Sequence, residues 1–156
     1  MVQGASDRST AGTTASEVLQ QRAGVCQDFA HVLLSCLRAQ GLAARYVSGY
    51  LLTQPPPGQP RLRGADASHA WASVWLPDLQ PADADPDHPP GGWLELDPTN
   101  NRWGWDTPGE DYVRVALGRD FSDVSPLRGV INGSRGGALE VAVTVEPEHE
   151  RNRSEA

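Results

Sequence analysis

The chain of 156 residues is long enough for one domain and too short for two of ordinary size. Hydrophobic residues make up 38% of it and charged residues 21%, a composition that excludes a fully disordered chain. The net charge of −7 disfavours binding to nucleic acid through phosphate neutralisation, and no apolar run approaches the ~20 residues of a membrane span. Residues 1–16 have no apolar segment typical of a secretory signal. We therefore expect a cytoplasmic protein that binds neither nucleic acid nor membranes.

The two cysteines, Cys26 and Cys36, are too few for a disulfide framework. If both lie on one helix, their Cα atoms are about 15 Å apart, beyond the ~7 Å that a disulfide tolerates. This cysteine usage is typical of a reduced, intracellular protein. The cysteines and the four histidines match no zinc-ligand spacing, and no nucleotide-binding motif is present. We expect neither a metal nor a cofactor.

Two helices are expected in the first quarter of the chain, after a flexible lead-in over residues 1–13. Thr14 and Glu17 have the spacing of a capping box, which predicts a helix to about Arg22, with Gly24 ending it in a left-handed conformation. A second helix is predicted from Cys26 to Gln40, because its apolar residues recur on one broad face: Phe29, Ala30, Leu33, Leu34, Cys36 and Leu37.

Strand signals follow the helices and are separated by loops rich in glycine and proline. Alternating or β-prone residues predict strands over 44–52, 69–76, 93–97, 111–117 and 139–145. Long loops are expected over 53–66, 77–92 and 118–138, and a charged tail over 146–156. Helices first and strands with hairpin-like spacing afterwards indicate an α+β domain, with an antiparallel sheet packed on the helices.

Cys26 is a candidate nucleophile because it begins the predicted second helix. The positive end of a helix lowers the pKa of a thiol, and free backbone N–H groups there can bind an oxyanion. The alternative is that Cys26 is a small buried apolar residue. Cys36, among leucines in the middle of the same helix, matches that alternative, and we assign it no role.

His69 and Asp97 are the candidate base and orienting carboxylate for this thiol. His69 begins one alternating strand and Asp97 ends the next. If the strands pair antiparallel, the two side chains are cross-strand neighbours, ~5 Å apart at Cβ, and both face the helix when the parity is right. The alternatives are an ordinary core or surface imidazole for His69 and a turn-starting role for Asp97, which precedes a proline.

Three segments in this order resemble the motifs of the transglutaminase-like superfamily. Gly24–Leu51 resembles its cysteine motif, Ser68–Leu76 its histidine motif and Gly92–Asn101 its aspartate motif. Gly118–Val130 is similar to the C-terminal segment of the bacterial branch, so the resemblance covers residues 14–145. It implies a papain-like core in which a cysteine-bearing helix packs on an antiparallel sheet.

The resemblance also implies a reaction. Cys26 would attack an amide carbonyl of a peptide or protein substrate, with His69 as base and Asp97 orienting it. A thioester would form, and water or an amine would then accept the acyl group. We favour hydrolysis of a peptide or isopeptide bond. A crosslinking transglutaminase, a catalytically silent interaction domain and an arylamine acyltransferase are the alternatives.

One departure from the family concerns the region before the cysteine helix. Bacterial relatives carry a longer segment there, whereas 25 residues precede Cys26 here. A fragment, a truncated gene and a minimal form all remain open. The backbone N–H of Cys26 is the one oxyanion donor that the sequence suggests.

The tryptophans have two possible roles, lining a cleft or packing on the sheet. We predict that Trp71 contacts substrate, that Trp75 and Trp93 pack on the sheet, and that Trp103 and Trp105 lie in a polar loop.

Two further features are assigned structural roles. His31 lies about 140° round the helix from Cys26, a poor position for its base. The aspartates of residues 83–87 fail the EF-hand pattern at the glycine and glutamate positions, so they predict a solvated acidic loop.

Overall fold

The computed structural model describes residues 14–54, 57–58, 68–79, 81–85, 87, 90–125 and 142–147. Three helices and five strands lie in this part of the chain: α1 (Ala15–Gln21), α2 (Cys26–Ala39), β1 (Ala44–Leu51), β2 (Ser68–Leu76), β3 (Gly92–Asp97), β4 (Arg102–Trp105), β5 (Tyr112–Gly118) and α3 (Phe121–Val124). The predicted lead-in over residues 1–13 and most of the 53–66 and 118–138 loops lie outside the described residues.

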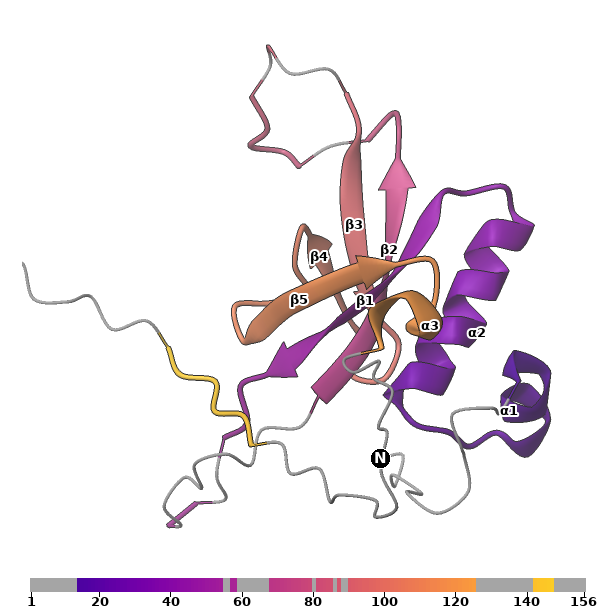
Figure 1. Ribbon diagram of the computed structural model, residues 1–156. Helices are drawn as coiled ribbons and strands as arrows, with labels where there is room; N and C mark the ends of the chain where they lie inside the picture. The colour runs from indigo at the N-terminus through magenta and orange to yellow at the C-terminus, as the bar shows by residue number, and fades with distance from the viewer. Residues whose placement is uncertain are drawn as a thin grey trace, which may run out of the picture.

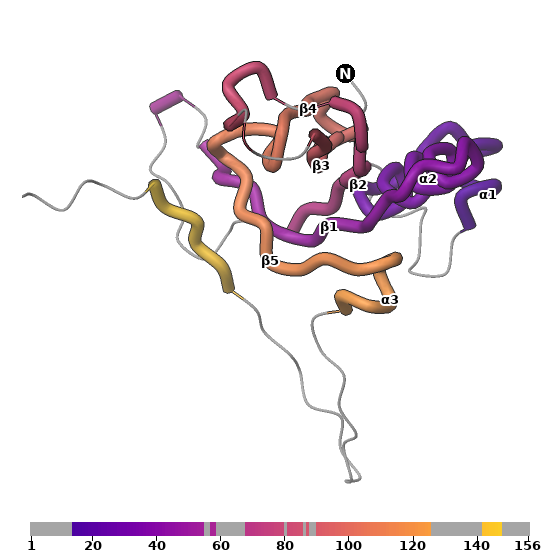
Figure 2. Tube along the Cα trace, turned by 90° about the horizontal axis from the view of Figure 1, so that it is seen from above, coloured from indigo at the N-terminus to yellow at the C-terminus, as the bar shows by residue number. Residues whose placement is uncertain are grey.

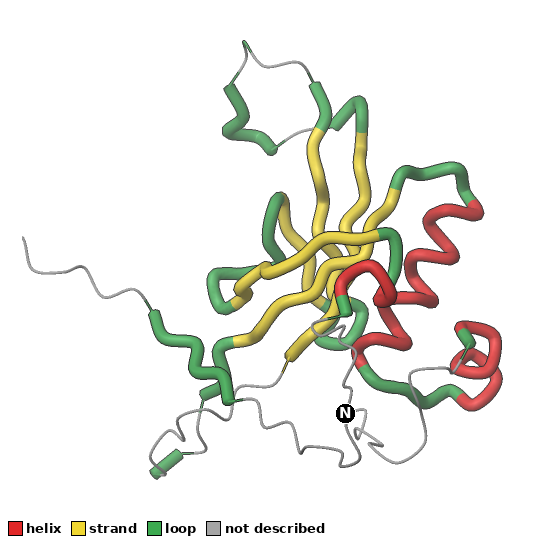
Figure 3. Tube along the Cα trace, viewed as in Figure 1, coloured by secondary structure: helices red, strands yellow, loops and turns green. Residues whose placement is uncertain are grey.

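The strands form one antiparallel sheet in the order β4-β3-β2-β1-β5 (Figure 1). Helices α1 and α2 lie to one side of the strands (Figure 3), and α3 packs beside β5 (Figure 2). The predicted α+β class is therefore confirmed. The loop between β2 and β3 projects at the end of the sheet opposite the start of α2. Its described aspartates Asp83, Asp85 and Asp87 are exposed, as expected of a solvated loop.

Two apolar clusters cover the two faces of the sheet. The first lies beneath α2 and contains Ala30, Leu34, Tyr46, Ala70, Ala72 and Val124. The second lies on the opposite face and contains Val47, Trp71 and Tyr112. Along β2, the small even-numbered alanines allow α2 to approach closely, and the odd-numbered side chains point away from it. His69 stacks on Trp71, and its ring also reaches the thiol of Cys26, the first residue of α2.

The first helix begins as predicted and ends differently. Thr14 Oγ1 accepts the Glu17 backbone N–H at 3.3 Å, and Glu17 Oε2 accepts the Thr14 N–H at 2.7 Å, which confirms the capping box. The left-handed residue at the C-terminus is Arg22, with φ of 52°, and not Gly24. Gly24 is required for another reason, since a Cβ there would lie 2.9 Å from the Asp28 Cβ.

Strand β4 and helix α3 were not predicted, and one predicted strand is not found where the structure describes it. β4 is four residues long and contains a glycine, too short for an alternation signal. Trp103 and Trp105 therefore lie on an edge strand rather than in a loop. Residues 142–147 contain only an isolated bridge at Val143, while 139–141 lie outside the described residues.

Helix α2, with 14 residues, is the longest helix in the part of the chain that the structure describes. Among the described residues no helix has the length and apolar character needed to cross a membrane.

Candidate active site

Cys26 is the first residue of α2, with its side chain half-buried. The turn before it is held by the buried carboxylate of Asp28, whose Oδ2 accepts the Val25 backbone N–H at 2.8 Å. The first turn of a helix leaves backbone N–H groups without acceptors in the helix. The thiol therefore sits where the chain concentrates hydrogen-bond donors.

His69 and Asp97 form a buried pair across two strands. His69 Nε2 lies 2.6 Å from Asp97 Oδ2, and their side chains are 8% and 0% exposed. Ala72 is paired with Leu96, so extension of this register places Asp97 opposite Trp71 and diagonal to His69. Direct cross-strand opposition was expected; the diagonal arrangement still brings the groups together because both side chains share one face.

Asp97 uses its two oxygens for two purposes. Oδ1 accepts the backbone N–H groups of Thr99 at 2.9 Å and Asn100 at 3.2 Å, closing the turn after β3. Oδ2 accepts hydrogen bonds from the Tyr112 hydroxyl at 2.7 Å and from Asn100 Nδ2 at 2.8 Å, and it pairs with His69. One carboxylate thus both closes the turn and pairs with the imidazole.

The electrostatics of the site favour an ionised carboxylate. Burial alone would raise the pKa of Asp97, but its hydrogen bonds with His69, Tyr112 and Asn100 and the charge of His69 hold it well below its usual range. Asn100 and Tyr112 were missed by sequence reasoning. Asn100 follows the aspartate in its turn and was within reach of inference, whereas Tyr112 lies on a strand that gave no sign of its partner.

The Cys26 thiol and the His69 imidazole are close enough to shift each other's pKa. Burial favours the neutral thiol, but interactions with His69 and with the backbone N–H groups of Ala70 and Gln27 lower the pKa of Cys26 overall. Burial likewise opposes protonation of His69, yet Asp97 and Cys26 raise its pKa to about 9. Since Nε2 faces Asp97, Nδ1 is the nitrogen left for the thiol. The arrangement suits a thiolate beside an imidazolium.

Stability should depend on the protonation of His69. Its pKa is raised from 6.5 to about 9 in the folded chain, so the charged ring stabilises the fold below about pH 6.5, and this contribution disappears as the pH rises through about 9. We expect His69→Gln to lower the melting temperature more at about pH 6 than at about pH 10. Thermal unfolding followed by circular dichroism measures this difference, and an equal loss at both values contradicts it.

Trp71 is fully buried, so its indole offers no surface to a substrate in this structure. The ring is stacked against His69 at 5.9 Å between centroids. Trp71 therefore packs inside the protein, and the predicted contact with substrate is not part of the function proposed below.

Trp75 and Trp93 pack against each other with ring centroids 5.6 Å apart. The Arg45 guanidinium lies 3.6 Å from the centre of the Trp93 ring. These contacts agree with the prediction that both tryptophans pack on the sheet.

His31 and Cys36 lie outside the cluster. His31 stacks on Tyr46 and its Nε2 accepts the Phe121 backbone N–H at 3.2 Å, which supports a structural role. Cys36 is exposed rather than buried among leucines, because its position on α2 faces away from the sheet. It provides an accessible thiol for comparison with Cys26.

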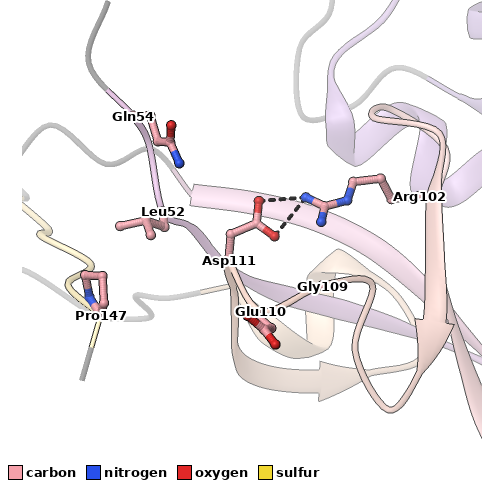
Figure 4. A pocket seen from close by; sticks show the side chains of 7 residues that line it. All are labelled: Leu52, Gln54, Arg102, Gly109, Glu110, Asp111 and Pro147. Carbon is pink, nitrogen blue, oxygen red and sulfur yellow. Dashed lines mark hydrogen bonds and ion pairs between the residues drawn. The ribbon is translucent and has the colours of Figure 1, made fainter. Parts of the chain in front are cut away.

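Figure 4 shows an open pocket of about 570 Å³. It is lined by Leu52, Gln54, Arg102, Gly109, Glu110, Asp111 and Pro147. Arg102 forms an ion pair with Asp111 at 2.6 Å, and its guanidinium carbon is 5.1 Å from the centre of the Tyr112 ring. None of Cys26, His69 and Asp97 lines this pocket.

Comparison with protein families matches residues 2–98 to the transglutaminase-like superfamily. The match covers more than half of the chain, which therefore belongs to this superfamily. The fold agrees: a crystal structure of a candidate cysteine protease from Cytophaga hutchinsonii superposes with a TM-score of 0.53 and 28% identity, over 77% of this chain and 32% of that one. The helices packed on a five-stranded antiparallel sheet are thus a papain-like core.

Curated relatives include two mycobacterial proteins and one enzyme. An uncharacterized protein of Mycobacterium tuberculosis is 50% identical over 91% of this chain and 42% of its own length. An uncharacterized protein of Mycobacterium leprae is 39% identical over 83% of this chain and 39% of its own length. A protein-glutamine gamma-glutamyltransferase of Pseudomonas aeruginosa is 34% identical over 50% of this chain and 10% of its own length. The chain spans less than half the length of these relatives.

Proposed function

We propose that this chain is a thiol-dependent enzyme that breaks a peptide or isopeptide amide bond, with Cys26 as nucleophile, His69 as acid and base, and Asp97 orienting His69. One observation carries the proposal: the buried His69–Asp97 pair, 2.6 Å apart, interacts with the Cys26 thiol at the start of a helix. The names of the Pseudomonas and Cytophaga relatives, a glutamyltransferase and a candidate cysteine protease, support chemistry on amide bonds.

The first half of the reaction forms a thioester. The Cys26 thiolate attacks the carbonyl carbon, and the carbonyl electrons move to oxygen, where the Cys26 backbone N–H is placed to stabilise the charge. As the tetrahedral intermediate collapses, the C–N bond breaks and the His69 imidazolium gives its proton to the leaving amine. Asp97 keeps the ring oriented and stabilises its charged form.

The second half transfers the acyl group. Neutral His69 takes a proton from the incoming water or amine, which attacks the thioester, and the Cys26 thiolate leaves as the acid or new amide forms. We favour water as acceptor, because the Cys26 side chain is only half-buried. The peptide or protein nature of the substrate remains part of the proposal.

A glutamine-containing peptide tests the choice of acceptor. The protein is incubated with the peptide and a primary amine, and products are quantified by mass spectrometry. We expect the glutamate-containing or cleaved product to exceed the product that carries the amine; ammonia is not diagnostic, because it leaves the glutamine amide whichever acceptor follows. An excess of the crosslinked amide would show that amine transfer dominates.

Thiol reactivity tests whether the site is chemically active at all. At about pH 6, an ordinary thiol is almost wholly protonated and reacts slowly. Cys36 is exposed and is the comparison within the same protein. We expect iodoacetamide to alkylate Cys26 much faster than Cys36, and His69→Ala to remove the difference. Equal rates in the wild-type protein would instead support a catalytically silent interaction domain.

A further inference from the structure

Glu95 is a fully buried carboxylate two residues before Asp97 on β3, on the same face of the sheet. A buried charge is costly unless both its partners and its hydrogen bonds are provided. Both are present here: Oε1 accepts from Arg114 Nη1 at 2.6 Å, and Oε2 accepts from the Trp71 indole N–H at 2.6 Å. Apolar packing of the sheet face would need neither the Glu95 carboxylate nor the Arg114 guanidinium. The free-energy cost of burying the carboxylate therefore suggests that it has a further role.

The indole of Trp71 is held on several sides. Glu95 fixes its N–H, and the Tyr112 ring meets it edge-on with centroids 5.3 Å apart. Gly49 leaves the space for its far edge, since a Cβ at that position would lie 2.7 Å from Trp71 Cη2. Trp71 has little freedom to move.

The clamped indole lies against the imidazole of His69. The two ring centroids are 5.9 Å apart and the planes are inclined by 28°. The bond from His69 Nε2 to Asp97 fixes one point of the imidazole, but a single hydrogen bond permits rotation about its own axis. A flat surface beside the ring restricts that rotation and thereby directs Nδ1 towards the thiol.

We propose that Trp71, fixed by the buried Glu95–Arg114 pair, is a positioning residue that sets the plane of the His69 ring. This inference rests on the proposed function and adds three residues to it. The path from the ring to the surface runs through Trp71 and Glu95 to Arg114, whose side chain is 40% exposed.

Three substitutions test this path in the full chain. Trp71→Phe keeps an aromatic plane and removes the N–H; Glu95→Gln keeps the shape and removes the charge; Arg114→Met removes the cation at the surface. We expect each substitution to slow alkylation of Cys26 relative to Cys36 at about pH 6 by about tenfold. This is the lower end of the effect seen when a residue that orients a metal-ligating side chain by a hydrogen bond is replaced. Arg114→Lys restores most of the rate because it restores the charge. The ¹⁵N-detected titration of His69 should shift in the same variants.

Trp75→Phe is the matched control. Trp75 projects from the same strand on the same side but packs against Trp93 instead of His69. It should lose a similar amount of thermal stability and leave the alkylation ratio and the His69 titration unchanged.

The outcomes separate the two proposals. If Trp71→Phe and Glu95→Gln lower the melting temperature but leave both readouts at wild-type values, Trp71 is only structural and the positioning role is refuted. If Trp71→Phe does not fold, Glu95→Gln and the two Arg114 variants decide by the same readouts. If wild-type Cys26 reacts no faster than Cys36, the proposed function itself fails and the positioning role fails with it.

Discussion

Replacement of Cys26 with Ser is expected to abolish acyl-enzyme formation. A hydroxyl has a much higher pKa than a thiol, so the imidazolium of His69 cannot hold it ionised as it holds the Cys26 thiolate. Turnover of an activated ester or amide should fall by about 10³-fold or more, since loss of a nucleophile removes the covalent path and leaves only binding and oxyanion stabilisation. Intact-protein mass spectrometry after an acid quench measures the trapped thioester directly.

The matched control is Cys36→Ser. Cys36 lies on the same helix, is exposed, and takes no part in the cluster described above. This variant should retain wild-type turnover. Its intact mass after the acid quench should still increase by one acyl group. A thioester on Cys36, or undiminished turnover in Cys26→Ser, contradicts the assignment of the nucleophile.

The second large effect is expected from Asp97→Asn. An amide in place of the carboxylate removes the charge that, with the hydrogen bonds, raises the pKa of His69 to about 9. That pKa should fall, the thiolate–imidazolium pair should become rarer, and turnover should decrease by about 10²- to 10⁴-fold, the upper figure being that of the same change in a serine-protease triad. Kinetics and the NMR titration of His69 measure the two effects separately.

Asp97→Ala provides the comparison. Asn retains an oxygen that can accept the Thr99 and Asn100 backbone N–H groups, whereas Ala loses that turn as well. Asp97→Asn should therefore keep most of its thermal stability, and Asp97→Ala should lose more. An Asn variant with wild-type turnover would remove Asp97 from the mechanism.

Helix α1 could be predicted from its capping box, and helix α2 and strands β1, β2, β3 and β5 from the recurrence of their apolar or β-prone residues. Cys26, His69 and Asp97 were also predicted, and the structure brings them together, since each lies at the end of such an element. The end of an element can be inferred from local patterns alone. The roles of the three residues in catalysis stay predictions.

The supporting residues could not be predicted in the same way. Tyr112 and Glu95 contact the site through sheet pairings between residues far apart in the chain. From the sequence, Glu95 was only one polar residue of a strand in which polar and apolar residues alternate. Alternation along a strand shows which side chains share a face, but not which face the helix covers.

Asp97 couples the folding of one turn to the assembly of the candidate site. The same carboxylate closes the turn that follows β3 and completes the pairing with His69. Reactivity of the thiol should therefore appear only when the β3–β4 hairpin has docked on β2. A nascent or partly unfolded chain is therefore expected to carry an unreactive cysteine.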